Sequence, residues 1–364
     1  MRGTGRRKRG VYSLMITIVD VARESGVSLG TASRALNGTS YVSAKTKAKV
    51  LETAERLHYI PNESARSLKL INTHTVIVIV QGISNLFYAP ILDILLRGLQ
   101  EKGYSAIVTP ADYTNDPVLL AKKMEREKNP NGIVFLGGDL RKMKDGLLTL
   151  EVPFVLTAIG TVDESIEFEN GVLVGGSDYM NGFMITDYLA SLGHRKIALL
   201  MAEPDTSISV MRVRGYQDAL KKYGIKYDEN LVFSAGEEGS NFSIESGYVA
   251  MSRILEKVPE FTALECLSDT LAFGAERALY EHGYDVPGDI SLTGMDGTPL
   301  AKYAVPRITT AEVDAMSLAE IGKEAILHLM QGKPEKKFYR TDIRLAVGGS
   351  SGPAPRRRRN EINF

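Results

Sequence analysis

The spacing of hydrophobic residues changes character near residue 74. Between residues 17 and 59, apolar residues recur every three or four positions, which predicts three short amphipathic helices with no strand between them. Residues 74–80 then form a bounded run rich in β-branched residues, typical of a strand that is buried on both faces of a parallel sheet. The chain is therefore expected to contain a small all-α domain followed by an α/β region.

Beyond this boundary, strand and helix patterns alternate in two series. In the first series we expect strands at 74–80, 106–109, 132–136 and 154–157, and helices at 91–102 and 118–128. In the second series we expect strands at 196–201, 263–268 and 291–293, and helices at 179–192, 211–222, 244–257 and 271–282. Such alternation predicts right-handed βαβ units in parallel sheets, and two series predict a two-lobed α/β domain.

The charge is distributed unevenly, although the whole chain has 44 basic and 44 acidic residues. Residues 1–74 carry thirteen Lys or Arg and five Asp or Glu, a balance of +8, so the remainder carries −8. A basic module on a mildly acidic body is typical of a nucleic-acid reader with a separate sensor, because only the reading module must neutralise phosphates. The 44% hydrophobic content excludes general disorder.

The sequence predicts a cytoplasmic protein without a membrane partner. No stretch approaches the roughly 18 apolar residues that a membrane-spanning helix needs. The basic run 6–9 and the apolar run 11–19 imitate a secretory signal, but Ser13 and Thr17 interrupt the apolar run and no small-residue cleavage site follows. The single cysteine, Cys266, cannot form an intramolecular disulfide, which suits a reducing compartment.

Residues 17–36 carry the start and stop signals of two helices joined by a tight corner. Thr17 is expected to cap the first helix with its side-chain oxygen, and Gly26 to end it in a left-handed conformation. Ser28 is expected to cap a second helix at 29–36. A third helix is expected at 45–58, and the outer face of the second would enter a DNA major groove.

The segment 18–68 (IVDVARESGVSLGTASRALNGTSYVSAKTKAKVLETAERLHYIPNESARSL) closely resembles the DNA-binding head and hinge of the lactose and galactose repressor family. The resemblance implies a helix-turn-helix domain in which Leu29 and Gly30 read bases. It also implies contacts to bases or phosphates from Thr17, Ser28, Thr31, Ser33, Arg34, Asn37, Tyr41, Ser43 and Thr46. Gly30 departs from the family pattern because it has no side chain with which to read a base, so specificity is expected to rest on Leu29 and Arg34.

The family resemblance also assigns a role to residues 61–73. It implies a hinge that folds on the operator and pairs with its dimer mate, with Ala65 and Leu68 at the contact and Leu68 inserted between base steps of the minor groove. An apolar wedge of this kind kinks the duplex, so that both heads of a dimer can reach adjacent major grooves.

Residues 74–347 resemble the sugar-binding body of the same family, which is itself similar to periplasmic sugar-binding proteins. The resemblance implies an effector site between the lobes, formed by Phe87, Tyr88, Arg212, Asp269 and Asp296. A guanidinium that donates paired hydrogen bonds and carboxylates that accept from hydroxyls suit a sugar. The chain departs from the family at Leu86, Ala158, Ser268 and Gly297, so the sequence assigns no particular sugar.

Eight segments are expected. They are a flexible basic arm at 1–14, the helix-turn-helix domain at 15–60, the hinge at 61–73, lobe 1 at 74–171 and 306–335, lobe 2 at 172–305 and 336–347, and a flexible tail at 348–364. The fold class is thus a small all-α helix-turn-helix domain followed by a two-lobed α/β periplasmic-binding-protein-like domain with parallel sheets.

These features predict a homodimeric repressor of carbohydrate-utilisation genes that a sugar releases from a near-palindromic operator on double-stranded DNA. One alternative is a co-repressed regulator that responds to a purine, and another is a solute-binding protein without a DNA role. A sugar-processing enzyme would need Asp269 and Asp296 as its catalytic pair, and no enzymatic activity is expected. The sequence contains no zinc-ligand spacing, phosphate loop or dinucleotide fingerprint, so neither a metal nor a cofactor is expected.

Overall fold

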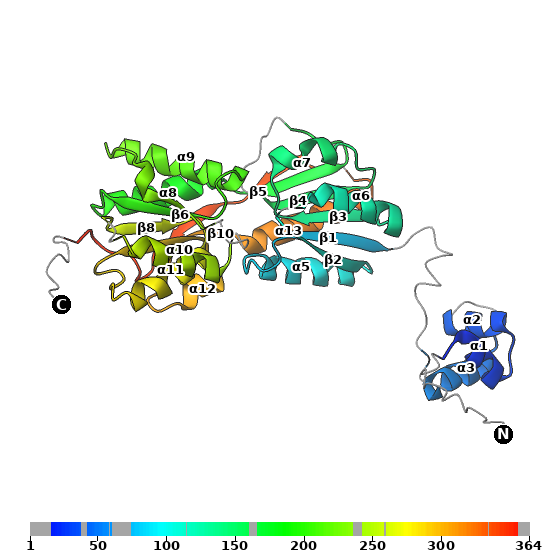
Figure 1. Cartoon of the computed structure of the whole chain (residues 1–364). Helices are drawn as coiled ribbons and strands as arrows, with labels where there is room; N and C mark the ends of the chain where they lie inside the picture. Colours follow the sequence, from blue (N-terminus) through cyan, green and yellow to red (C-terminus); the bar gives the residue numbers. More distant parts are fainter. Residues whose placement is uncertain are drawn as a thin grey trace, which may run out of the picture. The chain divides into compact units, whose positions relative to one another are not determined.

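The computed structural model describes residues 16–37, 42–57, 59, 74–113, 115–159, 166–235, 242–257, 260–333 and 335–355. The chain divides into two compact units, Met1–Asn72 and Thr73–Phe364, which we describe separately (Figure 1). The predicted arm at 1–14, the hinge at 61–73 and the site residues Tyr41, Ala65 and Leu68 lie outside the described residues. No helix in the described ranges is long and apolar enough to cross a membrane.

The first unit contains the three predicted helices, α1 (Ile18–Ser25), α2 (Leu29–Asn37) and α3 (Ala44–Arg56). Its core is made of small and β-branched residues: Val21, Ala22, Ala32, Ala35, Val50 and Ala54. Small side chains let the three short helices approach closely and still bury a common face. Gly26 ends α1 with φ 67°, as its position before the corner predicted.

In the second unit, the first lobe is built on a parallel six-stranded sheet with strand order β11-β5-β4-β3-β1-β2. The strands are β1 (Thr75–Gln81), β2 (Ser105–Ala111), β3 (Gly132–Leu136), β4 (Phe154–Ile159), β5 (Gly171–Gly175) and β11 (Phe338–Arg340). Alternate residues of β1 pack on opposite faces, against α5 (Tyr88–Glu101) and α13 (Ala315–Met330) on one side and α6 (Pro117–Lys128) and α7 (Leu140–Leu147) on the other. The β-branched run is therefore buried on both faces.

The second lobe repeats this three-layer plan with strand order β12-β10-β9-β8-β6-β7 (Figure 1). Its strands are β6 (Ile197–Met201), β7 (Val232–Ser234), β8 (Ala263–Cys266), β9 (Ser291–Asp296), β10 (Thr309–Val313) and β12 (Ile343–Ala346), the last antiparallel to β10. Helices α8 (Asp178–Ser191) and α9 (Ser207–Lys222) pack on one core cluster. Helices α10 (Ile244–Leu255) and α11 (Asp269–Glu281) pack on the other. A short 3-10 helix, η1 (Glu229–Leu231), and a short helix, α12 (Pro299–Tyr303), complete the lobe.

The predicted crossings between the lobes, near 171, 306 and 335, are each several residues too early. Because β5 belongs to the first sheet, the first crossing follows residue 175, and because β10 belongs to the second sheet, the next follows residue 313. The last lies between β11 and β12, after residue 340. The assignments of 172–175 and 336–340 to lobe 2, and of 306–313 to lobe 1, were wrong because sheet membership is decided by long-range pairing.

Residues 348–355 also correct a prediction, because they are packed rather than forming part of a flexible tail. Ser350 is buried, its N–H donates to Arg307 O at 3.0 Å, and its carbonyl accepts from Leu292 N at 2.7 Å. A Cβ on Gly348 would lie 2.1 Å from the Arg307 carbonyl oxygen, so only glycine allows this approach. Residues 356–364 lie outside the described part of the chain.

Candidate functional site

Helix α2 presents an exposed N-terminal face. Ser28 caps the helix, with its hydroxyl accepting from Thr31 N at 3.2 Å. Leu29 is 51% exposed although it is a large apolar residue, and Gly30 beside it borders open space, since an added Cβ would meet only Ser28 Oγ at 3.9 Å. Residues 32 and 35 of the same helix are buried in the core. The helix therefore has one face for packing and one free face that can lie against a partner.

The other predicted DNA contacts cluster at helix N-termini. Ser43 caps α3 by accepting from Thr46 N at 3.2 Å. At α1, Thr17 is the N-cap residue, as predicted, and forms a capping box with Asp20, whose Oδ2 accepts from Thr17 N at 3.0 Å and from Thr17 Oγ1 at 2.7 Å. Exposed N-termini of this kind suit phosphate oxygens.

Three further predicted contacts lie on α2. Arg34 is exposed and Ser33 is half-buried. Asn37 is the last residue of α2. Lys45, Lys47 and Lys49 add exposed positive charge near the start of α3.

A cavity lies between the two lobes at the carboxyl ends of β1, β4 and β9, lined by Gln81, Ile159 and Asp296 among others. It encloses about 960 Å³, including its opening to solvent. This position is typical of ligand sites in open α/β folds. Four of the five predicted effector residues line it, namely Phe87, Tyr88, Arg212 and Asp296.

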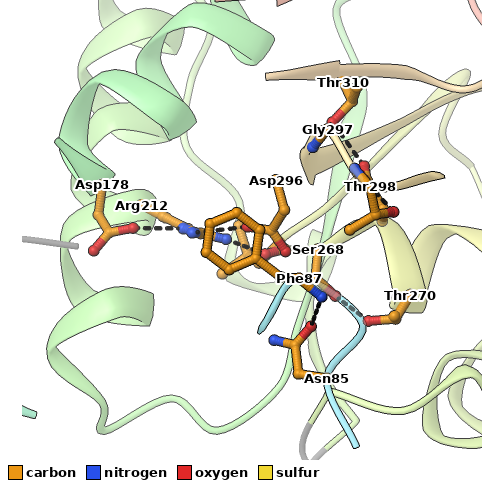
Figure 2. A network of polar contacts seen from close by, with 12 residues as sticks. Asn85, Phe87, Asp178, Arg212, Ser268, Thr270, Asp296, Gly297, Thr298 and Thr310 are labelled. Carbon is orange, nitrogen blue, oxygen red and sulfur yellow. Dashed lines mark hydrogen bonds and ion pairs between the residues drawn. The ribbon is translucent and has the colours of Figure 1, made fainter. Parts of the chain in front are cut away.

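Arg212 on α9 lines the cavity and lies at the centre of a polar network with Asp178 and Asp296, which we call the cavity floor (Figure 2). Its Nε donates to Asp178 Oδ1 at 2.8 Å, its Nη2 donates to Asp296 Oδ1 at 3.3 Å, and its Nη1 donates to the Leu267 carbonyl oxygen. The arrangement depends on close packing of α8 against α9, because a Cβ on Gly182 would lie 2.0 Å from the Arg212 carbonyl oxygen. Three protein oxygens thus orient one buried guanidinium.

The electrostatics of this floor follow from burial. Burial raises the pKa of the Asp178 carboxyl and raises that of Asp296 to about 6, while the nearby guanidinium opposes both shifts. Burial would lower the pKa of Arg212, but the two carboxylates hold it above its usual value. Asp296 adopts φ 105°, a conformation that L residues rarely take, which aims its carboxylate at Arg212.

Aromatic rings from both lobes line the cavity. From the first lobe, Phe87 and Tyr88 lie 5.8 Å apart between ring centroids, and Asn85 Oδ1 holds the turn by accepting from Phe87 N at 3.0 Å. Tyr113, also from the first lobe, packs against Phe242 of the second lobe at 5.9 Å. Rings of this kind can cover the apolar face of a sugar or stack on a planar base.

Asp269, the fifth predicted effector residue, does not line the cavity. It is fully buried, and its carboxylate accepts from Thr298 N at 2.6 Å, Thr298 Oγ1 at 3.0 Å and Thr310 Oγ1 at 2.7 Å (the threonines are labelled in Figure 2). Both of its oxygens are therefore used to join α11, α12 and β10. The structure gives Asp269 a role in holding the second lobe together instead of the predicted ligand contact.

The cavity-lining residues that were not predicted from the sequence include Asp139, Asp178, Asn181, Tyr113 and Phe242. Asp139 joins the lobes at the rim, since its Oδ2 accepts from Ser207 N of the second lobe at 3.0 Å, while its Oδ1 caps α7 by accepting from Arg141 N at 3.0 Å. Arg141 Nη2 adds a bond to the Asp205 carbonyl oxygen at 2.7 Å. In the sequence, Asp139 could be identified only as a helix-capping residue before α7. Such a pattern predicts where a helix begins but does not show that the residue lies at a cavity.

No cluster of three or more His, Cys, Asp or Glu among the described residues could hold a metal ion.

Comparisons with known proteins bear on both parts of the chain. Residues 17–62 match the model of bacterial regulatory proteins of the lacI family, and residues 186–351 match a periplasmic binding protein-like domain. The chain is 32% identical over 332 residues to the HTH-type transcriptional regulator MalR of Clostridium butyricum, covering 91% of this chain and 97% of that protein. It is 32% identical over 325 residues to the HTH-type transcriptional repressor PurR of Vibrio atlanticus (strain LGP32), covering 89% and 94%. A solved structure of the transcriptional regulator CelR in complex with cellobiose is 26% identical, with a TM-score of 0.66, covering 92% of this chain and 100% of that one.

Proposed function

Because this chain belongs to the lacI family of bacterial regulatory proteins, which are DNA-binding regulators and not enzymes, we propose that it is a repressor whose grip on an operator is released by a sugar. The genes under its control would be those of carbohydrate utilisation. The observation that carries the proposal is the buried polar network around Arg212, which lines a cavity between the two lobes. The same chain has the exposed helix α2 in its first unit.

The exposed face of α2 supports the DNA-binding part. An apolar side chain such as Leu29, half-exposed at the start of a capped helix, can contact thymine methyl groups and base edges in the major groove. The lysines at the start of α3 and the exposed Arg34 would neutralise phosphates. A single head contacts one half-site, so a near-palindromic operator requires two heads.

An exposed aromatic groove on the second lobe supports a homodimer. Tyr280 is 73% exposed, Tyr303 is 76% exposed and Val305 is 93% exposed, and all three line one groove beside α11 and α12. Large apolar residues gathered on one face indicate a protein interface, and a second copy of this chain would cover the same face symmetrically.

The cavity supports a sugar as the effector. Carboxylates and a guanidinium that are oriented in advance suit neighbouring hydroxyl groups, and Phe87 and Phe242 offer apolar surfaces. The CelR relative is described in complex with cellobiose, which favours a carbohydrate here too. Release from the operator would follow only if the sugar binds the two states of the lobes with different affinity.

A salt-dependent binding assay on near-palindromic duplexes selected from random sequence tests the proposal. Tight binding to one motif, abolished by one sugar from a panel of mono- and disaccharides and purines, is the expected result. The absence of sequence-selective binding, with and without the panel, would refute the proposal and favour a solute-binding protein.

A purine co-repressor is the second candidate, and the four aromatic rings that line the cavity favour it, because rings stack well on a flat base. The same assay separates the two: a purine effector would be required for operator binding, whereas a sugar inducer would abolish it.

A further inference from the structure

The lining of the cavity contains two hydrogen-bond acceptors that the described protein leaves without a donor. Asp178 Oδ2 and Asn181 Oδ1 are buried and have no hydrogen-bond partner among the described residues. Both residues line the cavity, and they lie three positions apart on α8, on the same side of the helix. A buried acceptor without a donor costs free energy, which the donor of a ligand would recover.

The floor also carries more negative than positive charge. Arg212 stands between Asp178 and Asp296, and each of its three nitrogens already donates to a protein oxygen (Figure 2). Two ionised carboxylates against one guanidinium leave a net charge of −1. At the rim, Asp139 forms an ion pair with Arg141 at 2.8 Å, and Glu203 and Lys142 are the other charged residues there among the described lining residues, so the rim is balanced.

Burial is the main cause of the raised pKa values of Asp178 and Asp296, and for Asp296 the neighbouring Asp178 carboxylate adds to the shift. A ligand that donates hydrogen bonds or carries an ammonium group would stabilise the ionised carboxylates. A ligand with a phosphate or carboxylate would place a further negative charge beside them. The charge of Arg212 is already shared by two carboxylates, and only one N–H of Nη1 and one of Nη2 remain to donate to such a ligand.

We infer that Asp178 and Asn181 form a subsite for the hydrogen-bond donors of the effector, and that the cavity takes a polyhydroxy ligand that is neutral or bears an amine and rejects one that bears a phosphate or carboxylate. Ligands of this class have in common two neighbouring hydrogen-bond donors and no negative charge. The donors can be hydroxyl groups or an ammonium group. The inference rests on the proposed function in one respect, namely that this cavity is the effector site.

Calorimetric titration of the full chain at neutral pH with matched compounds tests the ligand class. For each of several pentoses and hexoses, the unmodified sugar, its amino derivative and its phosphate ester are compared. We expect that a neutral or amino compound binds, and that the phosphate ester of the same sugar binds at least about tenfold more weakly. The inference is overturned if only phosphorylated or carboxylated compounds bind, or if no neutral or amino compound binds.

Three variants test the subsite itself. Asp178→Asn should weaken the bound neutral or amino ligand by about tenfold or more and reduce discrimination against the phosphate ester, because a charge-assisted acceptor is lost. Asn181→Ser should weaken the same ligand without changing the charge of the floor. Asp187→Asn is the matched control, because Asp187 lies on the same helix but pairs with Lys222 outside the cavity, and it should bind as the wild type does.

Operator binding without ligand, measured by fluorescence anisotropy, separates the two proposals. The control variant Asp187→Asn should bind selected operator duplexes as tightly as the wild type, and retained operator binding by Asp178→Asn and Asn181→Ser shows that these two variants are folded. Wild-type ligand affinity in both Asp178→Asn and Asn181→Ser would overturn the subsite and leave the DNA-binding proposal standing. If the wild-type protein itself does not bind any selected operator duplex, the result would instead count against the proposed function.

Discussion

A buried glutamate behind the cavity gives a stability prediction that can be worked out from the structure. Glu265 on β8 is fully buried, and one of its oxygens lies 2.5 Å from Thr186 Oγ1 while the other has no partner among the described residues. Thr186 Oγ1 also lies 2.9 Å from the Gly182 carbonyl oxygen, to which its single proton can be donated. Both contacts are satisfied together when Glu265 is a neutral acid that donates to Thr186.

The magnitude follows from the pKa of this group. Burial raises the pKa of Glu265 from 4.5 to about 8, against weaker opposing effects of Thr186 and Arg212. Between these two values the unfolded chain loses the proton and the folded chain keeps it, so rising pH stabilises the unfolded state by about 1.4 kcal/mol per pH unit. Between pH 5 and pH 8 the loss of folding stability from this one group is about 3 kcal/mol.

Glu265→Gln should remove this pH dependence. Urea unfolding of the full chain is followed by circular dichroism at several pH values. Between pH 5 and pH 8, the free energy of unfolding of the variant minus that of the wild type should increase by about 3 kcal/mol. Glu256→Gln, on the exposed end of α10, is the control and should run parallel to the wild type. If the Glu265→Gln curve also runs parallel, the argument that Glu265 is protonated in the folded protein is refuted.

Four further predictions concern DNA, effector and assembly. Leu29→Ala should leave the head folded, because the side chain is half-exposed, and should weaken operator binding in anisotropy titrations by about tenfold. Arg212→Lys should abolish the effector response while operator binding persists, because an ammonium cannot bridge two carboxylates and a carbonyl; a normal response would remove Arg212 from the site. Tyr303→Asp should shift sedimentation toward the monomer if the aromatic groove is the dimer face. Leu68→Ala should reduce operator affinity and DNA bending without changing ligand affinity in calorimetry, and unchanged bending would eliminate the wedge.

The sequence predictions were accurate for elements that depend on neighbouring residues and failed for elements that depend on distant parts of the chain. Helix α2 was predicted within one residue because its start depends on Ser28 and a local alternation of small buried residues. The strand β1 was equally clear, since residues buried on both faces leave an uninterrupted apolar run. Strands β5 and β10 and helix α13 were missed, because their places depend on pairing and packing with segments far away in the chain.

The predicted site shows the same division. Asp269 and Asp296 each lie at or just after the end of a strand of the second sheet, and sequence spacing could not tell them apart. In the structure, Asp269 begins α11 and turns back to bond two threonines, whereas φ 105° at Asp296 aims its carboxylate at Arg212. Asp178 was missed because it lies 34 positions from Arg212, and only the packing of α8 on α9 brings them together.

The distribution of the cavity residues between the lobes constrains how a ligand could act at the DNA. Asp178, Arg212 and Asp296 all belong to the second lobe, whereas Asn85 and Phe87 belong to the first. A ligand bonded only to the floor would bind equally well whether the lobes were together or apart, and so could not shift the equilibrium between these states. An effector must therefore also contact the first lobe, where it would add to the bonds of Asp139 and Arg141 across the rim. Removing those rim bonds should weaken ligand binding even though neither side chain need touch the ligand, because the ligand would then have to supply a larger share of the free energy that holds the lobes together.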